Sequence, residues 1–145
     1  MSLDVVLHLR DRLELFREVA RLLPLGGRFL FTDAGVLTGS VSNEEVHERS
    51  VHGYTQFVAV GWNERLLESA GFRLIETEDQ TRSVLENANG RLATMQAHRA
   101  ELEQISRAAD LESQRDYLET VVEVSRRGAV SRVMYLAEVH HPRAV

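Results

Sequence analysis

Apolar residues recur at helix and strand spacings along most of the chain. From Asp11 onward they follow intervals of three and four residues, which predicts a helix capped by Asp11 with apolar positions at Leu15, Phe16, Val19, Leu22 and Leu23. Pro24 and Gly26–Gly27 end this helix, and the apolar run at residues 28–32 predicts a buried strand. The apolar segment at residues 3–9 predicts another strand or strand end. This order of elements predicts a right-handed βαβ unit with parallel strands.

The pattern continues through the rest of the chain with a change of element type. Residues 35–61 are expected to form a long irregular connection with an acidic helical stretch near residues 43–50. Asn63 is expected to cap a short helix that ends at Gly71, and residues 72–78 predict a third strand. Two amphipathic helices are expected at residues 82–108 and 111–127, and the alternation over residues 130–139 predicts a half-buried final strand. We interpret residues 1–145 as a single α/β domain.

Composition narrows the class of protein. The net charge is −5, and acidic and basic residues are interspersed, whereas a nucleic-acid-binding surface would show clustered basic residues. The chain has no polybasic patch for a membrane surface, and its apolar stretches are too short to span a bilayer. It also has no cysteine, which excludes disulfides and fits a reducing compartment. We therefore expect a cytoplasmic protein without nucleic-acid or membrane partners.

Three segments in order carry a resemblance to a known family: SLDVVLHLRDR at residues 2–12, REVARLLPLGGRFLFTDA at 17–34 and NERLLESAGFRLIETEDQT at 63–81. Together they resemble class I S-adenosylmethionine-dependent methyltransferases, especially phosphoethanolamine and sarcosine/dimethylglycine N-methyltransferases. The resemblance implies the C-terminal half of a Rossmann-like sheet, with about four strands, mostly parallel, and an antiparallel last strand. The helical pair at residues 82–127 would then be a lid or a dimerisation insertion.

The same resemblance makes one absence informative. The family binds S-adenosylmethionine on a Gly-rich loop after its first strand and on an acidic residue after its second strand. No Gly-x-Gly-x-Gly follows a predicted strand in these residues, and both elements would precede Met1. We therefore expect a truncated form that lacks the cofactor half and is inactive alone. A misplaced start, a cloning boundary and a true fragment would each explain this.

Asp4 and His8 are the candidate catalytic residues. In the phosphoethanolamine methyltransferases that the chain resembles, the matching Asp and His lie in the active site. Methyl transfer needs an acceptor amine or hydroxyl that has lost its proton, and histidine is the side chain suited to remove it near neutral pH. A nearby carboxylate can fix the imidazole tautomer or hold a cationic amine. Alternatively, Asp4 and His8 cap the strand end and the next helix.

Asp33 and Tyr54 are the candidate substrate-binding residues. Asp33 follows the predicted second strand, where ligands bind in open α/β sheets, although aspartate also commonly ends strands. Tyr54 matches a tyrosine that the phosphobase enzymes place near substrate phosphate, but His52 stands where they have an arginine. A phosphorylated substrate is therefore disfavoured, and packing of Tyr54 in the loop is the alternative. His47 and His52 lie five residues apart, which does not place both on one helical face, so we expect no metal site.

Two functions follow from these features. The first is a methyltransferase that transfers a methyl group to nitrogen or oxygen of a small molecule, with His8 as general base and residues 35–61 and 82–127 as a substrate lid. The alternative is a non-catalytic fragment or interaction module that binds no cofactor. In both cases we expect a homodimer or larger homo-oligomer, formed through the open apolar edge at residues 3–9, through the helices at 82–127, or through both.

Overall fold

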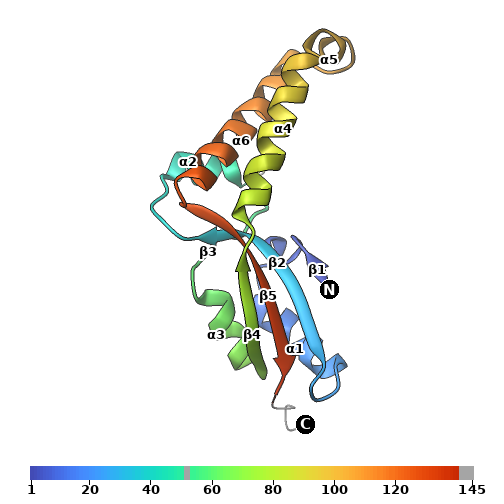
Figure 1. Cartoon of the computed structure of the whole chain (residues 1–145), viewed down its shortest axis with the longest axis vertical. Helices are drawn as coiled ribbons and strands as arrows, with labels where there is room; N and C mark the ends of the chain where they lie inside the picture. The colour runs from blue at the N-terminus through green and yellow to red at the C-terminus, as the bar shows by residue number, and fades with distance from the viewer. Residues whose placement is uncertain (51–52, 141–145) are drawn as a thin grey trace.

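A computed structural model describes residues 1–50 and 53–140, in which a mixed sheet carries helices and a projecting helical arm (Figure 1). The strands are β1 (Ser2–Leu3), β2 (Arg28–Leu37), β3 (Val58–Ala59), β4 (Phe72–Asp79) and β5 (Val130–Val139). The helices are η1, a 3-10 turn (Val6–His8), α1 (Arg12–Leu22), α2 (Asn43–Arg49), α3 (Trp62–Ser69), α4 (Thr81–Ala97), α5 (Arg99–Ile105) and α6 (Ala108–Arg126).

The sheet order is β1-β2-β5-β4, with β3 also paired to β2. The strands β1 and β3 pair with β2 in parallel, whereas β5 runs antiparallel to both of its neighbours, β2 and β4. Four strands therefore point the same way and the last one points the opposite way. This confirms the predicted α/β class and its antiparallel final strand, and β1–α1–β2 is the predicted parallel βαβ unit.

The core lies between the sheet and the helices α1 and α3. Phe16 of α1 is fully buried against Phe29 and Phe31 of β2, and the Phe31 ring stacks on Tyr135 of β5 with centroids 4.8 Å apart. The predicted cap of α1 is present, because the Asp11 side chain accepts a hydrogen bond from the Glu14 amide. Burial of these aromatic rings fixes α1 and α3 on one face of the sheet.

Several expected element boundaries were wrong. In residues 3–9 only Leu3 is in a strand; Asp4 then takes a left-handed conformation, with φ of 51°, and Val6–His8 form a 3-10 turn. A short apolar run does not distinguish a strand from a buried turn, and Val6 and Leu7 are buried here. The strand β2 extends to Leu37, beyond the point where an irregular connection was expected.

The helical regions also differ from the prediction in detail. Asn63 does not cap α3; Gly61 does, in a left-handed conformation, and Asn63 is fully buried in the second helical position. The expected pair of helices at residues 82–127 consists of three helices, because α5 lies between α4 and α6. Together these helices form a projection that we call the arm, residues 81–126 (Figure 1). Near the sheet, Ala88, Leu118 and Val121 form its buried core.

Candidate functional site

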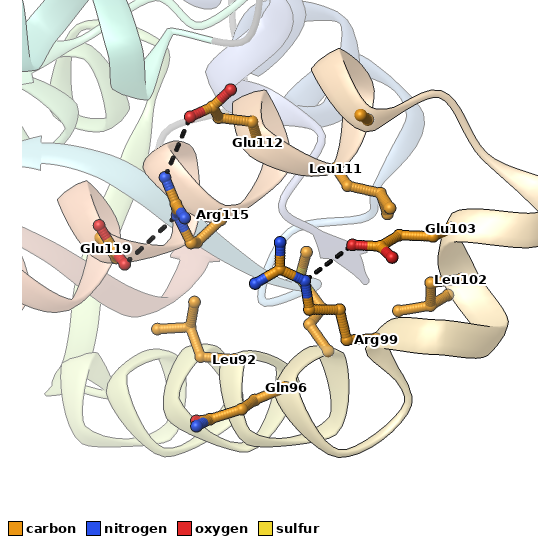
Figure 2. Close-up of a pocket in the computed structure, with 11 residues that line it drawn as sticks. Leu92, Gln96, Arg99, Leu102, Glu103, Leu111, Glu112, Arg115 and Glu119 are labelled. Atoms are coloured by element: carbon orange, nitrogen blue, oxygen red, sulfur yellow. Dashed lines mark hydrogen bonds and ion pairs between the residues drawn. The ribbon is translucent and has the colours of Figure 1, made fainter.

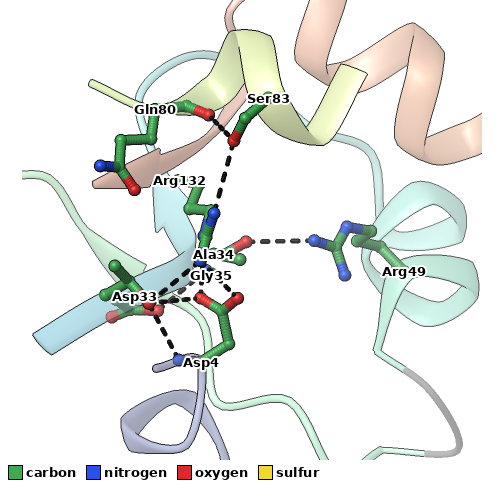
Figure 3. Close-up of polar contacts among 9 residues, drawn as sticks. Asp4, Asp33, Ala34, Gly35, Arg49, Gln80, Ser83 and Arg132 are labelled. Carbon is green, nitrogen blue, oxygen red and sulfur yellow. Dashed lines mark hydrogen bonds and ion pairs between the residues drawn. The ribbon is translucent and has the colours of Figure 1, made fainter. Parts of the chain in front are cut away.

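Asp4 lies directly after β1 (Figure 3), at the carboxyl end of this strand and beside Thr32 in the middle of the parallel strand β2. Its amide donates a hydrogen bond of 2.9 Å to Thr32 Oγ1, and the Thr32 hydroxyl donates one of 2.8 Å back to Asp4 Oδ1. This reciprocal pair holds Asp4 in a left-handed backbone conformation, which side chains other than glycine adopt at a cost. The bonds to Thr32 therefore stabilise the unfavourable backbone conformation that places the Asp4 carboxylate here.

Arg132 of β5 binds the same carboxylate with both ends of its guanidinium fork. Arg132 Nε lies 3.1 Å from Asp4 Oδ1, and Nη2 lies 3.0 Å from Asp4 Oδ2. The pair is partly exposed, with 20% of the Arg132 side chain and 40% of the Asp4 side chain accessible. A bidentate pair of this kind fixes the direction of the carboxylate as well as its charge.

Arg132 also connects Asp4 to the start of the arm. Its amide donates to Thr81 Oγ1, its carbonyl accepts from the Gln80 amide, and its Nη1 lies 3.4 Å from Ser83 Oγ (Figure 3). The first turn of α4 is therefore bonded to both the backbone and the side chain of the residue that holds Asp4.

His8 lies at the end of η1, exposed to solvent. Its Nδ1 is 3.3 Å from the carbonyl oxygen of Tyr54, which can only accept a hydrogen bond, so this contact assigns the proton to Nδ1. The other nitrogen, Nε2, then carries the free lone pair. The surrounding loop is fixed by a backbone hydrogen bond of 2.6 Å from the Gln56 amide to the Leu7 carbonyl. The structure thus brings His8 and Tyr54 together, while the Tyr54 side chain is 69% exposed.

Asp33 is placed differently from the expectation of a residue in a pocket. It lies within β2 instead of after it and is fully buried. Its carboxylate forms a buried ion pair with Arg12 of α1 and accepts hydrogen bonds of 2.8 Å from Asn63 Nδ2 and from the Gly35 amide. These bonds join α1, β2 and α3. These contacts of the Asp33 carboxylate are all with other residues of the fold. The contact of Asp33 with substrate therefore stays a prediction.

The four candidate residues do not form one cluster among the described contacts. Thr32 and Asp33 are consecutive in β2, so their side chains point to opposite faces, and Asp4 lies with Thr32. Within residues 1–50 and 53–140, no hydrogen bond joins Asp4 to His8. The imidazole tautomer is therefore set by the Tyr54 carbonyl and not by the Asp4 carboxylate. His52, where the resembled family has an arginine, lies outside the described residues.

Two glycines that follow Asp33 pack closely against other atoms of the chain. A Cβ at Gly39, in the loop between β2 and α2, would lie 3.0 Å from the Gly128 carbonyl oxygen, and one at Gly35 would lie 3.3 Å from Asp33. These glycines allow close approach of the protein's own atoms. Among the residues that the structure describes, no group of three or more His, Cys, Asp or Glu is arranged to hold a metal ion, and no helix is long and apolar enough to cross a membrane.

Comparison with known proteins gives matches among solved structures only. No protein-family profile and no curated protein matches the sequence. A protein of Galdieria sulphuraria assigned as a sarcosine dimethylglycine methyltransferase is 19% identical, with a TM-score of 0.79 over 96% of this chain and 51% of its own. Phosphoethanolamine N-methyltransferase 2 of Haemonchus contortus, in complex with phosphomonomethylethanolamine and S-adenosylhomocysteine, is 18% identical, with a TM-score of 0.83 over 97% of this chain and 33% of its own. The fold is that of a methyltransferase.

A third match shows that the likeness is one of fold. A cyclopropane synthase from Mycobacterium tuberculosis is 15% identical, with a TM-score of 0.76 over 87% of this chain and 49% of its own. The chain thus spans a third to a half of the length of these structures and corresponds to the C-terminal portion of the methyltransferase fold. The recognition made from the three sequence segments is confirmed at this level.

The sequence patterns did not identify two arginines that bind the aspartates of this region. Arg132 stands at a polar position of an alternating strand, where an exposed side chain is the ordinary interpretation. Arg12 is 97% buried, and the sequence did contain a sign of it, since Arg12 lies four residues before Phe16 on the apolar stripe of α1. A cation on such a stripe needs a buried partner, but nothing local identified Asp33 as that partner.

Proposed function

We propose that these residues form the acceptor-substrate half of an S-adenosylmethionine-dependent methyltransferase that transfers a methyl group to nitrogen or oxygen of a small molecule. The observation that carries the proposal is the position of Asp4 and His8 just beyond the carboxyl end of β1, in a chain with this fold. Ligands of open α/β sheets bind beyond the carboxyl ends of the strands. The methyl donor is inferred from structural neighbours that were solved with S-adenosylmethionine or S-adenosylhomocysteine.

In this proposal His8 is the general base. With the Nδ1 proton donated to the Tyr54 carbonyl, the free Nε2 lone pair can accept a proton from an amine or hydroxyl. His8 is exposed, so an acceptor can reach it without displacing buried side chains. The contact with Tyr54 also favours a ring orientation in which Nε2 points away from the Tyr54 carbonyl.

Asp4 is proposed to attract a cationic amine, and Tyr54 to line the acceptor site. The Asp4 carboxylate is partly accessible, and Arg132 aims it while offsetting part of its negative charge. The fully buried Asp33 would act on the acceptor only through the positions of Arg12 and Asn63. A strongly anionic acceptor is disfavoured at Asp4 itself because two negative charges would meet there.

We infer that the 145 residues alone do not bind the methyl donor, because they contain no Gly-rich loop after a strand and their glycines at Gly35 and Gly39 pack against protein atoms. Calorimetric titration with S-adenosylhomocysteine tests this, with no binding expected in the micromolar range. Micromolar binding would contradict it. The DNA immediately upstream of the Met1 codon gives an independent test, because an in-frame strand and Gly-rich loop would supply the missing half.

The acceptor site is tested by nuclear magnetic resonance of the His8 ring during titration with ethanolamine, phosphoethanolamine, sarcosine and dimethylglycine. A small amine should shift the His8 signals with a saturating curve, and Asp4→Asn should weaken the binding. The exposed residue Glu86 provides the matched control, since Glu86→Gln removes a carboxylate on the arm and should leave the curve unchanged. If no amine or alcohol perturbs His8 or Asp4, the acceptor-site proposal fails.

The second candidate function is a non-catalytic interaction module that forms homo-oligomers. Leu3, the last residue of the edge strand β1, and Val5, two residues later, are about half exposed, at 51% and 52%, which favours contact with another chain there. The arm offers another surface for self-association, because the helices at residues 82–127 are predicted to be a lid or a dimerisation insertion. Absence of acceptor binding together with stable self-association would favour this second function.

A further inference from the structure

The distal half of the arm is hollow. Near the sheet, α4 and α6 bury Ala88, Leu118 and Val121 between them. Farther out, a cavity of about 460 Å³ opens between α4, α5 and α6 (Figure 2). Residues of all three helices line this cavity, and α5 contributes Arg99, Leu102 and Glu103.

The cavity has an apolar lining and a charged rim. Leu92, Met95, Leu102 and Leu111 contribute partly buried side chains to the lining. The rim carries two arginines and three glutamates joined as ion pairs within helices: Arg99 with Glu103 at 2.7 Å, and Arg115 with Glu112 at 3.5 Å and Glu119 at 3.7 Å (Figure 2). These charged side chains are all about half exposed or more, so the rim faces solvent with both signs of charge.

An isoleucine protrudes beside this cavity. Ile105, the last residue of α5, is 81% exposed and lies three residues after Leu102, which lines the cavity. A single exposed apolar side chain is common on protein surfaces. Here, however, a protruding apolar side chain and an apolar cavity lie next to each other on the same end of the arm.

We propose that two copies of the chain associate arm to arm, with Ile105 of each copy seated in the distal cavity of the other. A protrusion next to a cavity is self-complementary about a two-fold axis, since each copy then supplies both parts of the contact. The mixed rim lets arginines of one copy face glutamates of the other, which a rim of a single sign would prevent. Helices α4 and α6 of the two copies then pack around a shared apolar centre, as in a four-helix bundle. The proposal rests on the self-association proposed above and names its surface.

The oligomeric state in solution gives the first test. Sedimentation should show a dimer, and Ile105→Glu should raise its Kd by at least about tenfold, because a central apolar anchor would become a buried charge. Leu25→Glu is the matched control: Leu25 is also exposed, at 67%, but lies in the turn before β2, far along the chain from the arm. A wild-type monomer at high micromolar concentration, or an Ile105→Glu dimer as tight as the wild type, would overturn the proposal.

The absence of cysteine from the chain allows a direct test of the contact. Ile105→Cys and Leu111→Cys are prepared separately, one with a heavy-isotope label, then mixed and oxidised gently. Disulfides between the two variants should form in excess over a mixture of Ile105→Cys with Leu25→Cys. Equal yields in the two mixtures would refute the arrangement.

These measurements require neither methyl donor nor acceptor. A chain that fails to dimerise but binds an amine at His8 would refute this inference and leave the acceptor-site proposal standing. A dimer linked through Ile105 in a chain that binds no acceptor would do the reverse.

Discussion

Replacing Asp33 by alanine removes the carboxylate that pairs with the buried guanidinium of Arg12. Within residues 1–50 and 53–140, the Arg12 and Asp33 side chains are 3% and 0% exposed, so neither is compensated by water. Asp33→Ala leaves Arg12 Nη1 with Asn63 Oδ1, at 2.8 Å, as its remaining contact. The Asn63 Nδ2 and the Gly35 amide each lose an acceptor as well.

The expected loss follows from these contacts. Breaking a buried ion pair by deleting one partner costs about 3–5 kcal/mol, because the other charge stays buried without compensation. Arg12 Nε already lacks a partner, and the acceptors that remain for the guanidinium, Asn63 Oδ1 and the Gln56 carbonyl, carry no charge that could replace Asp33. We therefore expect Asp33→Ala to lower the free energy of unfolding by about 3–5 kcal/mol and the Tm by about 10–15 °C. Asp33→Asn keeps an acceptor oxygen and should cost about 1–3 kcal/mol.

Urea unfolding followed by circular dichroism and by Trp62 fluorescence measures this loss. Glu86→Ala is the control, because its ion pair with Arg82 has a comparable distance of 2.7 Å but side chains that are 63% and 89% exposed. It should change stability by less than about 0.5 kcal/mol. If Asp33→Ala costs no more than Glu86→Ala, the buried cluster does not hold α1 and α3 to the sheet and the reasoning is wrong.

Three further outcomes can be measured on the same protein. A hydrogen bond from Arg127 is the largest cause that lowers the pKa of Glu45 from 4.5 to about 2. The ionised Glu45 therefore stabilises the fold above pH 4.5, and this stabilisation is lost as the pH falls toward 2. The carboxyl resonance of Glu45 should show this titration, and Arg127→Ala should raise the pKa of Glu45. Burial raises the pKa of Tyr135 above its ordinary value of 10.0. Its absorbance should therefore show ionisation in urea at a pH where the native phenol stays protonated, and stability should fall as the pH rises above 10.0. Gly128, with φ of 68° after α6, should cost about 1 kcal/mol as alanine, whereas Gly90→Ala in the open middle of α4 should stabilise by up to about 1 kcal/mol in thermal unfolding.

The sequence predicted those parts of the fold that depend on local spacing. The helix capped by Asp11, the strand at residues 72–78 and the alternating strand at residues 130–139 are recovered because each has its own periodic pattern and its own start or stop residue. The strand β2 was cut short, because Gly35 suggested a break where the structure has only a register irregularity between Asp33 and Val36.

The candidate site was harder to predict because its contacts join distant residues. The bonds that orient Asp4 come from Thr32 and from Arg132, which lies 128 residues away. Asn63 looked like a helix cap because asparagine favours that position, yet tertiary packing placed it inside the first turn with Asp33 as its partner. Pairing of this kind depends on the sheet order, which residue spacing alone does not determine.

That sheet order also dictates when the molecule can fold during synthesis. The strand β5 lies between β2 and β4 but follows all other described elements in the chain, and β4 pairs with no other strand among the described residues. While the ribosome makes residues 81–126, β4 therefore has no partner, whereas the arm can already form from contacts between neighbouring helices. We expect the nascent chain to have a folded arm and an incompletely paired sheet until Val130–Val139 leave the ribosome. Translation stalled within the arm would thus leave the β4 edge exposed to aggregation, and release past β5 would close it.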